Sequence, residues 1–329
     1  MTVLVTGGAG YIGSHMAHLL SDRGEPPVIL DNLSTGFDWA IPADATLVVG
    51  DIADKDLLDR VFKAHGITAV IHFAGSIIVP ESVDNPLKYY HNNTAKTRTL
   101  IEACVYNDIE NFIFSSTAAV YGMPEVNPIT EEERLLPISP YGTSKLMSEL
   151  MMRDCAAAYP FRYVALRYFN VAGADPKLRC GQSTKDATHL IKVANQVALG
   201  QRDQLSIYGT DYPTADGTCI RDYIHVTDLA EAHYLALQHL RAGGEALALN
   251  CGYGHGFSVR EVVETLEAVI GRPIDKVETE RRAGDPPSLV ADSGQLRARF
   301  GWEPAHDDLA QIIRHALDWE EKLSLRNRA

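Results

Sequence analysis

The sequence predicts an α/β fold in which a doubly wound parallel sheet carries a smaller α/β domain. A short apolar strand at residues 2–6 runs directly into a glycine-rich loop and a helical pattern. Further apolar strands then alternate with helical stretches, an order typical of parallel sheets that are covered by helices on both faces. The candidate strands span residues 2–6, 27–31, 46–49, 68–73, 110–116 and 162–168, with another near 246–250.

The composition changes after Asn170, which divides the chain into two predicted domains. Turn signals become frequent beyond this point, with clusters at 209–217 and 282–288. We expect residues 1–170 to form the larger domain and residues 171–329 to form mainly the smaller one. Some later strands are expected to return to the larger domain.

Glycines at positions 7, 10 and 13 connect the first strand to a helix predicted at 14–23. This spacing permits a tight turn, close approach of the backbone to a pyrophosphate, and close packing of the helix on the strand. The positive end of the helix then faces the anion. This Rossmann-type pattern predicts a dinucleotide site that is formed by Gly7, Gly10, Tyr11, Ile12 and Gly13.

Asp31 ends the second candidate strand, 24 residues after Gly7. A carboxylate at this place accepts hydrogen bonds from ribose hydroxyls and repels a 2′-phosphate. Asn32 follows the acid, and no arginine or lysine occurs in residues 32–36. The pattern favours NAD over NADP; the alternative is that Asp31 serves only as a turn residue at the strand end.

Tyr141 and Lys145 lie one helical turn apart in a segment that begins with Ser139 and Pro140. Ser139 suits a helix N-cap and Pro140 suits the first helical position, so the two side chains share one face. A phenol that acts as a base near neutral pH needs its pKa lowered by roughly 3 units, about 4 kcal/mol. The ammonium, the helix dipole and a cationic cofactor are expected to lower it. The alternative is an ordinary amphipathic helix pair.

Ligands of such sheets bind beyond the carboxyl ends of the strands, where further segments are expected to converge. Thr117 follows the fifth strand, and its hydroxyl beside Tyr141 would provide a proton relay; a turn-forming role is the alternative. The remaining candidates are Asp51 and Ile52 for the adenine, Phe73, Ala74 and Gly75 near the pyrophosphate, and Ser115, Tyr168 and Asn170 at the ends of the fifth and sixth strands.

Length and composition indicate a globular protein of one large or two modest domains. The 329 residues are 46% hydrophobic, which is enough for a sizeable core. The formal charge of −13 argues against a nucleic-acid or anionic-membrane surface, and no apolar run reaches membrane-spanning length. The five cysteines form no Cys-x-x-Cys pair and are expected to be reduced. Because a strand begins at once, we expect no signal peptide and a cytoplasmic location.

Nine motifs together resemble the UDP-glucose 4-epimerase family, a branch of the extended short-chain dehydrogenase/reductases. They lie at residues 6–15, 31–33, 50–52, 71–75, 114–122, 139–145, 167–170, 218–226 and 281–285, so the resemblance covers nearly the whole chain. In this family, NAD that stays bound takes a hydride from C4 of the hexose of a UDP-sugar. The 4-keto sugar then turns and takes the hydride back on its other face, which interconverts UDP-galactose and UDP-glucose.

The resemblance implies a role for each matched residue. Tyr141 is the base, Lys145 tunes it and touches the nicotinamide ribose, and Thr117 assists the proton transfer. Asn93 and Tyr168 are implied to lie near the cofactor. Contacts with the UDP-sugar are implied for Asn170, His189, Tyr208, Arg221, Arg282, Asp285 and Leu289. A surface ion pair is the alternative for the two arginines, because Asp222 and Asp285 are nearby in the sequence.

Two positions depart from the family pattern, and a third bears on specificity. Some relatives carry a lysine where this chain has Ile77, so one cofactor contact is missing or is supplied elsewhere. His189 stands where relatives carry an amide, and we expect it to replace that amide as a phosphate contact. Leu289 is intermediate between a tyrosine that excludes a 2-acetamido group and a small residue that admits it. Weak action on UDP-N-acetylglucosamine is therefore expected.

Helices near 87–106 and 141–159 are rich in leucine, methionine and alanine. The resemblance implies that this pair forms a four-helix homodimer interface; burial within one subunit is the alternative. The histidines, among them His225 and His255, show no metal-ligand spacing, and His72 lies in a buried-looking strand. We therefore expect no metal site.

Other classes of protein fit the sequence less well. A sugar-nucleotide dehydratase needs an acid pair after Thr117, whereas Ala118 and Ala119 occupy these positions. A non-catalytic NAD-sensing protein would be free to lose Tyr141 or Lys145. A net oxidoreductase would release NADH in each turnover. Within the epimerases, UDP-xylose/UDP-arabinose and UDP-N-acetylglucosamine are the alternative substrates.

Overall fold

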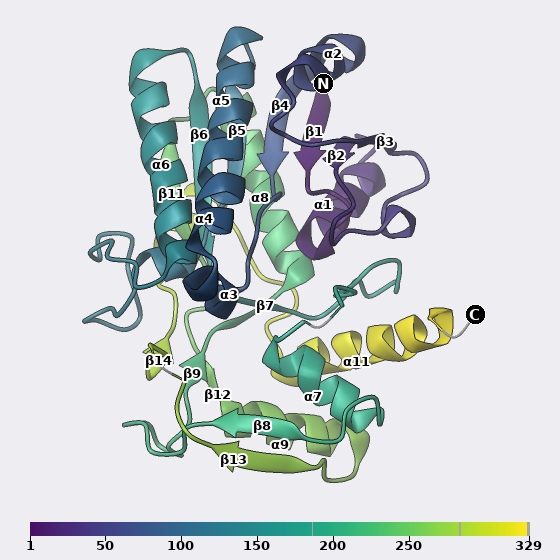
Figure 1. Cartoon of the computed structure of the whole chain (residues 1–329), viewed down its shortest axis with the longest axis vertical. Coiled ribbons are helices and arrows are strands. Elements are labelled where there is room, and N and C mark those ends of the chain that lie inside the picture. The colour runs from purple at the N-terminus through teal and green to yellow at the C-terminus, as the bar shows by residue number, and fades with distance from the viewer. Residues whose placement is uncertain (186, 283, 328–329) are drawn as a thin grey trace.

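The computed structural model describes residues 1–185, 187–282 and 284–327, so Ala283 of the 281–285 turn lies outside these ranges. Figure 1 shows two lobes, one built on a helix-covered sheet and one built from shorter strands and helices. The predicted α/β class is confirmed. Among the described residues, no helix combines the length and the apolar content needed to cross a membrane.

A seven-stranded parallel sheet forms the centre of the larger lobe, in the order β11-β6-β5-β4-β1-β2-β3. Its strands are β1 (Thr2–Thr6), β2 (Val28–Asp31), β3 (Thr46–Val49), β4 (Ile67–His72), β5 (Asn111–Ser115), β6 (Arg162–Tyr168) and β11 (Leu247–Cys251). The predicted strands are confirmed to within one residue at each end. Strand order reverses between β1 and β4, and a crevice for ligands is expected beyond the carboxyl ends at such a point.

Side chains of each strand alternate between two buried apolar layers. Val3 and Val5 share one layer with α1 (Tyr11–Asp22) and α8 (Val226–Arg241). Leu4 belongs to the other layer, which contains side chains of α2 (Lys55–His65), α5 (Lys96–Tyr106) and α6 (Pro140–Ala158). Burial of both faces is typical of a parallel sheet. Because α8 and β11 follow residue 170, the chain returns to the larger lobe after it has entered the smaller one.

The helix predicted near 87–106 is not regular. It consists of α4 (Pro86–Tyr89), the π-helical segment η2 (Tyr90–Ala95) and α5. The π-helical turn carries the buried Asn93, whose amide nitrogen donates to Ser144 Oγ at 3.1 Å and to the Ser76 carbonyl at 2.9 Å. Such wide turns are frequent at functional sites.

Short strand pairs build much of the smaller lobe. β7 (Asn170–Ala172) pairs with β10 (Tyr223–His225), β9 (Ile220–Arg221) lies between β12 (Phe257–Ser258) and β14 (Ser288–Leu289), and β8 (Leu205–Tyr208) pairs with β13 (Lys276–Thr279). Helices α7 (Leu190–Ala198), α9 (Val259–Ile270) and α11 (Leu309–Arg326) pack against one another, while α10 (Gly294–Phe300) packs on β11 and α8. The remaining short elements are α3 (Val79–Asp84), η1 (Asp38–Ala40) and η3 (Ala118–Val120).

Three buried histidines make the stability of this fold depend on pH. Burial lowers the pKa of His72 to about 3 and those of His15 and His233 to about 4. Unfolded histidines titrate near pH 6.5, so below that pH the unfolded chain binds more protons than the folded protein. The free energy of unfolding should therefore fall as the pH drops from about 6.5 toward 4. Each histidine contributes at most about 1.4 kcal/mol per pH unit.

Chemical denaturation between about pH 7 and pH 5 measures this slope. His72→Gln should make the slope shallower, whatever it does to the stability at neutral pH. His91→Gln, at an exposed position, is the control for the substitution itself. A slope that is unchanged in His72→Gln would contradict the assignment.

Candidate active site

The loop between β1 and α1 has two positions at which only glycine fits. A Cβ on Gly7, whose φ is +69°, would lie 2.6 Å from the Ala74 amide nitrogen, and one on Gly13 would lie 2.2 Å from the Gly7 carbonyl oxygen. Both neighbours are backbone atoms that cannot move aside. Gly10 is the N-cap residue and has no side chain, so the first amides of α1 stay available for an anion. The geometry fits a pyrophosphate at the predicted place.

Two predicted acids lie at the ends of the neighbouring strands. The Asp31 carboxylate accepts hydrogen bonds from the Ala9 amide at 2.9 Å and the Leu33 amide at 2.8 Å. These bonds fix it against the glycine loop and leave it lone pairs for ribose hydroxyls. Asp51 forms an ion pair with Lys96 at 2.6 Å, a partner that the sequence reasoning missed. Asp51 is thus held in place by a cation on α5 before any ligand binds.

Other predicted cofactor residues lie close to these acids or to the catalytic pair. Asn32 is exposed beside Asp31, and its side-chain oxygen accepts a hydrogen bond from the Ser34 amide at 3.0 Å. Ile52 is buried after β3. Gly75 lies next to Lys145, because a Cβ on this glycine would be 3.7 Å from Lys145 Nζ. The cofactor candidates from several strand ends are therefore brought together along one edge of the sheet.

Tyr141 and Lys145 project from the first turns of α6 and are both buried. The predicted cap is present, because Ser139 Oγ accepts a hydrogen bond from the Gly142 amide at 3.2 Å. Lys145 Nζ donates to the Ser115 carbonyl at 3.0 Å and lies 4.8 Å from the centre of the Phe114 ring. The ammonium is therefore anchored at the carboxyl end of β5.

The pKa shifts of this pair correct one expectation. The sequence predicted a lowered pKa for Tyr141, but burial raises it, and hydrogen bonding to the Thr117 side chain opposes that rise. Burial also lowers the pKa of Lys145 to about 8, which the charge of Glu149 opposes. Both shifts arise because an apolar site disfavours the charged form. In the protein alone the phenol is thus protonated at neutral pH, and further positive charge is needed to ionise it.

Residues around the pair are joined by hydroxyl contacts. Ser115 Oγ shares a short hydrogen bond with the Tyr168 hydroxyl. Thr117 is the N-cap of η3, and its Oγ1 accepts from the Ala119 amide at 3.1 Å. The turn-forming role that was the alternative for Thr117 is therefore present, and it does not prevent the hydroxyl from reaching the phenol.

Five of the seven predicted substrate residues form two groups in the smaller lobe. Leu289 on β14 lies opposite Arg221 on β9, and an Arg221 nitrogen lies 3.7 Å from the Asp285 carboxylate. The guanidinium of Arg282 lies 3.8 Å from the centre of the Tyr208 ring, a cation–π contact. The proposed alternative of an ion pair is thus present for Arg221, whose side chain is nevertheless only 12% exposed.

Leu289 also joins the two lobes. It packs against a small apolar cluster of Val120, Tyr121 and Ile129, which follows Thr117 in the chain. The Leu289 side chain therefore lies between strand β9, which carries Arg221, and the segment that follows Thr117.

Asn170 and His189 line one small cavity together with Tyr11. His189 is the N-cap residue of α7, but its side chain makes no capping hydrogen bond. Lys192 and Glu320 form a buried ion pair in the same cavity wall. The two predicted contacts are thus brought together, and the charged pair beside them was missed from the sequence.

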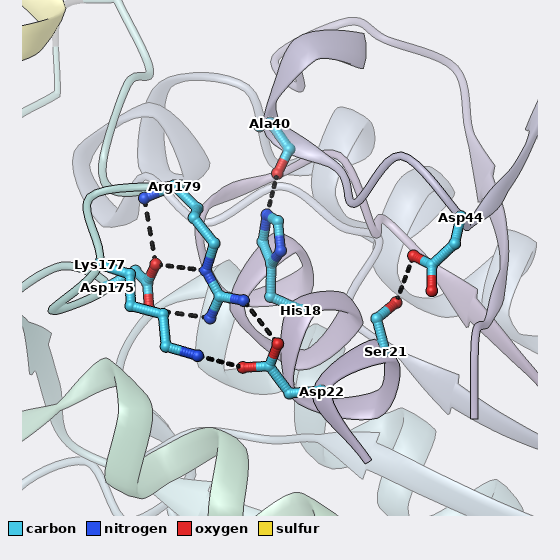
Figure 2. A network of polar contacts seen from close by, with 8 residues as sticks. All are labelled: His18, Ser21, Asp22, Ala40, Asp44, Asp175, Lys177 and Arg179. Carbon is cyan, nitrogen blue, oxygen red and sulfur yellow. Dashed lines mark hydrogen bonds and ion pairs between the residues drawn. The ribbon is translucent and has the colours of Figure 1, made fainter. Parts of the chain in front are cut away.

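Arg179 connects the loop after β7 to helix α1. Figure 2 shows it between Asp175 and Asp22, to which it donates at 2.7 Å from Nε and at 2.7 Å from Nη1. Asp22 is the last residue of α1, whose other end forms the glycine loop. The Gly173 carbonyl accepts a hydrogen bond from the Tyr11 hydroxyl at 2.7 Å. The segment after β7 is therefore fixed to both ends of α1.

Three histidines that sequence spacing left apart come together in the fold. One ring nitrogen each of His225, His306 and His315 lies within 4.8 Å of the others. His225 Nδ1 accepts from the Thr227 amide at 3.1 Å, so its other nitrogen carries the proton that is donated to His315 Nδ1 at 3.0 Å. The His306 ring lies over the His225 ring, with centroids 4.5 Å apart. The His225 and His306 rings are tilted by 32° to each other, and the three imidazoles form a group that could hold a metal ion, which the sequence spacing did not predict.

Glu149 is the clearest residue that sequence reasoning missed. It lies one helical turn beyond Lys145, is buried, and pairs with Arg167 at 2.6 Å. The available signal was spacing, because an acid four residues after Lys145 lies on the same side of the predicted helix.

The glycine loop, the strand-end acid Asp31 and the buried Tyr141–Lys145 pair define a dinucleotide-binding protein with an acid–base site. Residues 3–252 match the model of the NAD dependent epimerase/dehydratase family, and the chain belongs to that family.

Relatives and solved structures agree with this family. The UDP-glucose 4-epimerase of Azospirillum brasilense is 60% identical over 321 residues, which are 98% of this chain and 92% of that protein. The crystal structure of UDP-glucose 4-epimerase from Brucella ovis in complex with NAD is 49% identical, with a TM-score of 0.94 over 96% of this chain and 97% of that chain. The UDP-Glc/GlcNAc 4-epimerase of Campylobacter jejuni is 46% identical, with a TM-score of 0.86 over 98% of this chain and 99% of that chain.

Proposed function

We propose that this protein is a UDP-glucose 4-epimerase, which interconverts UDP-galactose and UDP-glucose at C4 of the hexose. The observation that carries the proposal is the buried Tyr141–Lys145 pair beside Thr117, at the strand ends that also hold the glycine loop. The likeness to the 60% identical UDP-glucose 4-epimerase over almost the whole chain supports it.

The residues present fit NAD. Close packing around Gly7 and Gly13 would bring the pyrophosphate to the start of α1, and Asp31 would accept from the adenosine ribose and repel a 2′-phosphate. Asn93, Tyr168 and the other cofactor candidates lie along the same edge of the sheet. When bound, NAD supplies a reversible hydride acceptor, and its positive ring supplies the charge that the buried phenol lacks.

Proton transfer is the work of the chain's own residues. Tyr141, once ionised beside the Lys145 ammonium, takes the proton from the sugar O4 and later returns it. Thr117 links the sugar hydroxyl to the phenol. The proton taken from O4 is returned, and the hydride that leaves C4 for bound NAD would return to C4, so the overall reaction is an isomerisation without net oxidation.

Binding of the substrate would concentrate on its nucleotide. Arg221, Arg282, Asn170 and His189 are candidates for the diphosphate, while Tyr208 and Asp285 are candidates for the uridine. Charged and aromatic contacts to UDP leave the hexose free to present either face. The alternatives to this function are UDP-xylose/UDP-arabinose or UDP-N-acetylglucosamine as substrate, a dehydratase, a net oxidoreductase, or a non-catalytic NAD-sensing protein.

Two other proposals concern location and assembly. We propose a cytoplasmic protein, supported by five free cysteines, of which all except Cys155 are buried. We also propose a homodimer through α5 and α6, supported by exposed apolar side chains on and near these helices, including Leu87 (77%), Met147 (43%) and Leu150 (38%). Localisation of a tagged protein and the hydrodynamic size in solution are the respective measurements.

Tyr141→Phe should remove the base and leave UDP-sugar binding nearly intact, because the phenol acts mainly in the transition state. Turnover of UDP-galactose should fall by at least about 100-fold, while the dissociation constant for UDP-galactose, measured by calorimetry, should change little. Tyr89→Phe is the matched control, because Tyr89 is a buried neighbour whose hydroxyl bonds to the Ile78 carbonyl and not to the site. Retention of a tenth of wild-type turnover in Tyr141→Phe would refute the assignment.

Leu289 should set the tolerance for a 2-acetamido group. We expect efficient action on UDP-galactose and weak action on UDP-N-acetylglucosamine, with Leu289→Ser raising the N-acetyl activity and Leu289→Tyr abolishing it. A wall residue changes the ratio of the two kcat/KM values, whereas a residue that only packs the core lowers both together. Leu135→Ser, in the same apolar cluster, is the control for packing alone. An unchanged ratio in both Leu289 variants would remove this residue from the pocket.

Leu150→Asp should convert the proposed homodimer into a monomer. A carboxylate at the centre of an apolar interface loses its hydration without gaining a partner. Light scattering would give the mass of the variant and of the control Leu136→Asp, which changes a loop residue that is 53% exposed elsewhere. A monomeric wild-type protein, or a dimeric Leu150→Asp, would contradict the proposed interface.

A further inference from the structure

A buried carboxylate connects the three segments that carry the reacting groups. Glu149 on α6 accepts from Arg167 Nη2 at 2.6 Å and from Arg167 Nε at 3.1 Å, and Ser116 Oγ also donates to it. The side chains of the ion pair are each only 6% exposed. One anion thus joins a helix, the end of β6 and the segment after β5.

Each of these partners is next to a residue of the proposed site. Ser116 immediately precedes Thr117, and Arg167 immediately precedes Tyr168. Glu149 lies one turn of α6 beyond Lys145, on the same side of the helix. A shift of the carboxylate would therefore change the spacing between the ammonium and the two strand ends.

The buried Glu149–Arg167 ion pair contributes little net stability to the fold. Removing two charges from water costs several kcal/mol per ion, and an apolar pair of similar volume is often as stable or more so. Arg167 also bonds the Tyr121 hydroxyl at 3.0 Å, and that hydroxyl donates to Asn250 at 2.7 Å. All the charges and hydroxyls of this network are satisfied, so it holds one arrangement of the strand ends.

We propose that Glu149 is a positioning residue that keeps Lys145 protonated and fixes its place relative to Thr117 and Tyr168, while Arg167 limits how much of the carboxylate's charge reaches the ammonium. The kinetic part of this inference rests on the proposed epimerase function. The electrostatic part concerns only the chain's own residues.

The surroundings of Lys145 leave Glu149 as the source of favourable charge. Burial lowers the pKa of Lys145, and the Glu149 carboxylate is the group whose charge raises it. The other groups that face α6 here are His72 from β4, which is neutral because burial lowers its pKa to about 3, Tyr141 from α6 itself, Tyr89 from α4 with its partner Glu81, Asn93 from the π-helical turn, and Arg167 and Tyr168 from β6. Glu81 is already paired with Lys88.

The test follows the titration of Lys145 itself. Protein carrying lysine labelled with carbon-13 at Cε is titrated by NMR, and the Lys145 signal is assigned by its loss in Lys145→Met. Glu149→Gln should move the midpoint to lower pH by about 1 unit, because an attractive charge is removed. Arg167→Met should move it to higher pH, because the carboxylate is no longer compensated. Shifts of opposite sign are not expected from a purely structural role.

A single variant leaves one buried charge unpaired and can fail to fold. The double variant Glu149→Gln with Arg167→Gln avoids this, since it leaves a neutral pair that can still form a hydrogen bond. Its Lys145 midpoint should also lie below that of the wild type. Glu102→Gln on α5 is the control, because Glu102 pairs with Arg98 at the surface and its loss should not move the midpoint.

The inference is overturned if the double variant titrates like the wild type, or if both single variants shift in the same direction. In epimerase assays, the alkaline limb of the kcat/KM profile should follow the NMR midpoints, because kcat/KM reports the pKa values of the protein without substrate. Shifted midpoints in a protein without epimerase activity would contradict the proposed function and leave the role of Glu149 in place.

Discussion

The parallel register of the central sheet is the constraint on which the rest of this molecule depends. Because β1, β2, β4, β5 and β6 all run in one direction, their carboxyl ends meet along a single edge. Asp31 and Tyr168 end two of these strands, and the glycine loop, Gly75 and Thr117 follow three others. A slip of one residue in any strand would turn its polar end group away from the edge and bury it in an apolar layer. Core packing and site geometry are therefore fixed by the same alternation of side chains.

Burial at this edge of the sheet disfavours the charged forms of both Tyr141 and Lys145. Removing Tyr141 from water raises its pKa, and removing Lys145 from water lowers its pKa to about 8, so in the protein alone the phenol stays neutral at pH 7 while Lys145 is still mostly charged. The same low dielectric strengthens any charge that arrives later. Under the proposed function, a cationic ring beside the phenol would reverse the shift of Tyr141. The base would then form only when the cofactor is in place.

The sequence predicted the features that neighbouring residues determine, and it missed those that depend on contacts between distant residues. The strands and the glycine loop follow from apolar runs and spacing, which few residues determine, and they are confirmed. The π-helical turn at Asn93 was not foreseen, because its cause is a set of hydrogen bonds to residues that are distant in the chain. In the protein alone the pKa of Tyr141 is raised rather than lowered, because the dipole and the ammonium are visible in the sequence and the depth of burial is not. The role of Glu149 was not predicted, because its partner Arg167 lies on another element and the two meet only in the folded protein.

The smaller lobe explains how a hexose could turn while its nucleotide stays in place. The buried Asp222 carboxylate accepts backbone amides of Tyr253 at 3.0 Å and Gly254 at 3.1 Å, and burial raises its pKa to about 6. These bonds hold the strand of Arg221 rigidly, so charged contacts to a diphosphate would be preorganised. Leu289, opposite that arginine, presents only an apolar surface to the larger lobe. Under the proposed function, a pocket wall formed by Leu289 would offer no hydrogen bond to either face of the sugar, so the two orientations would differ little in free energy.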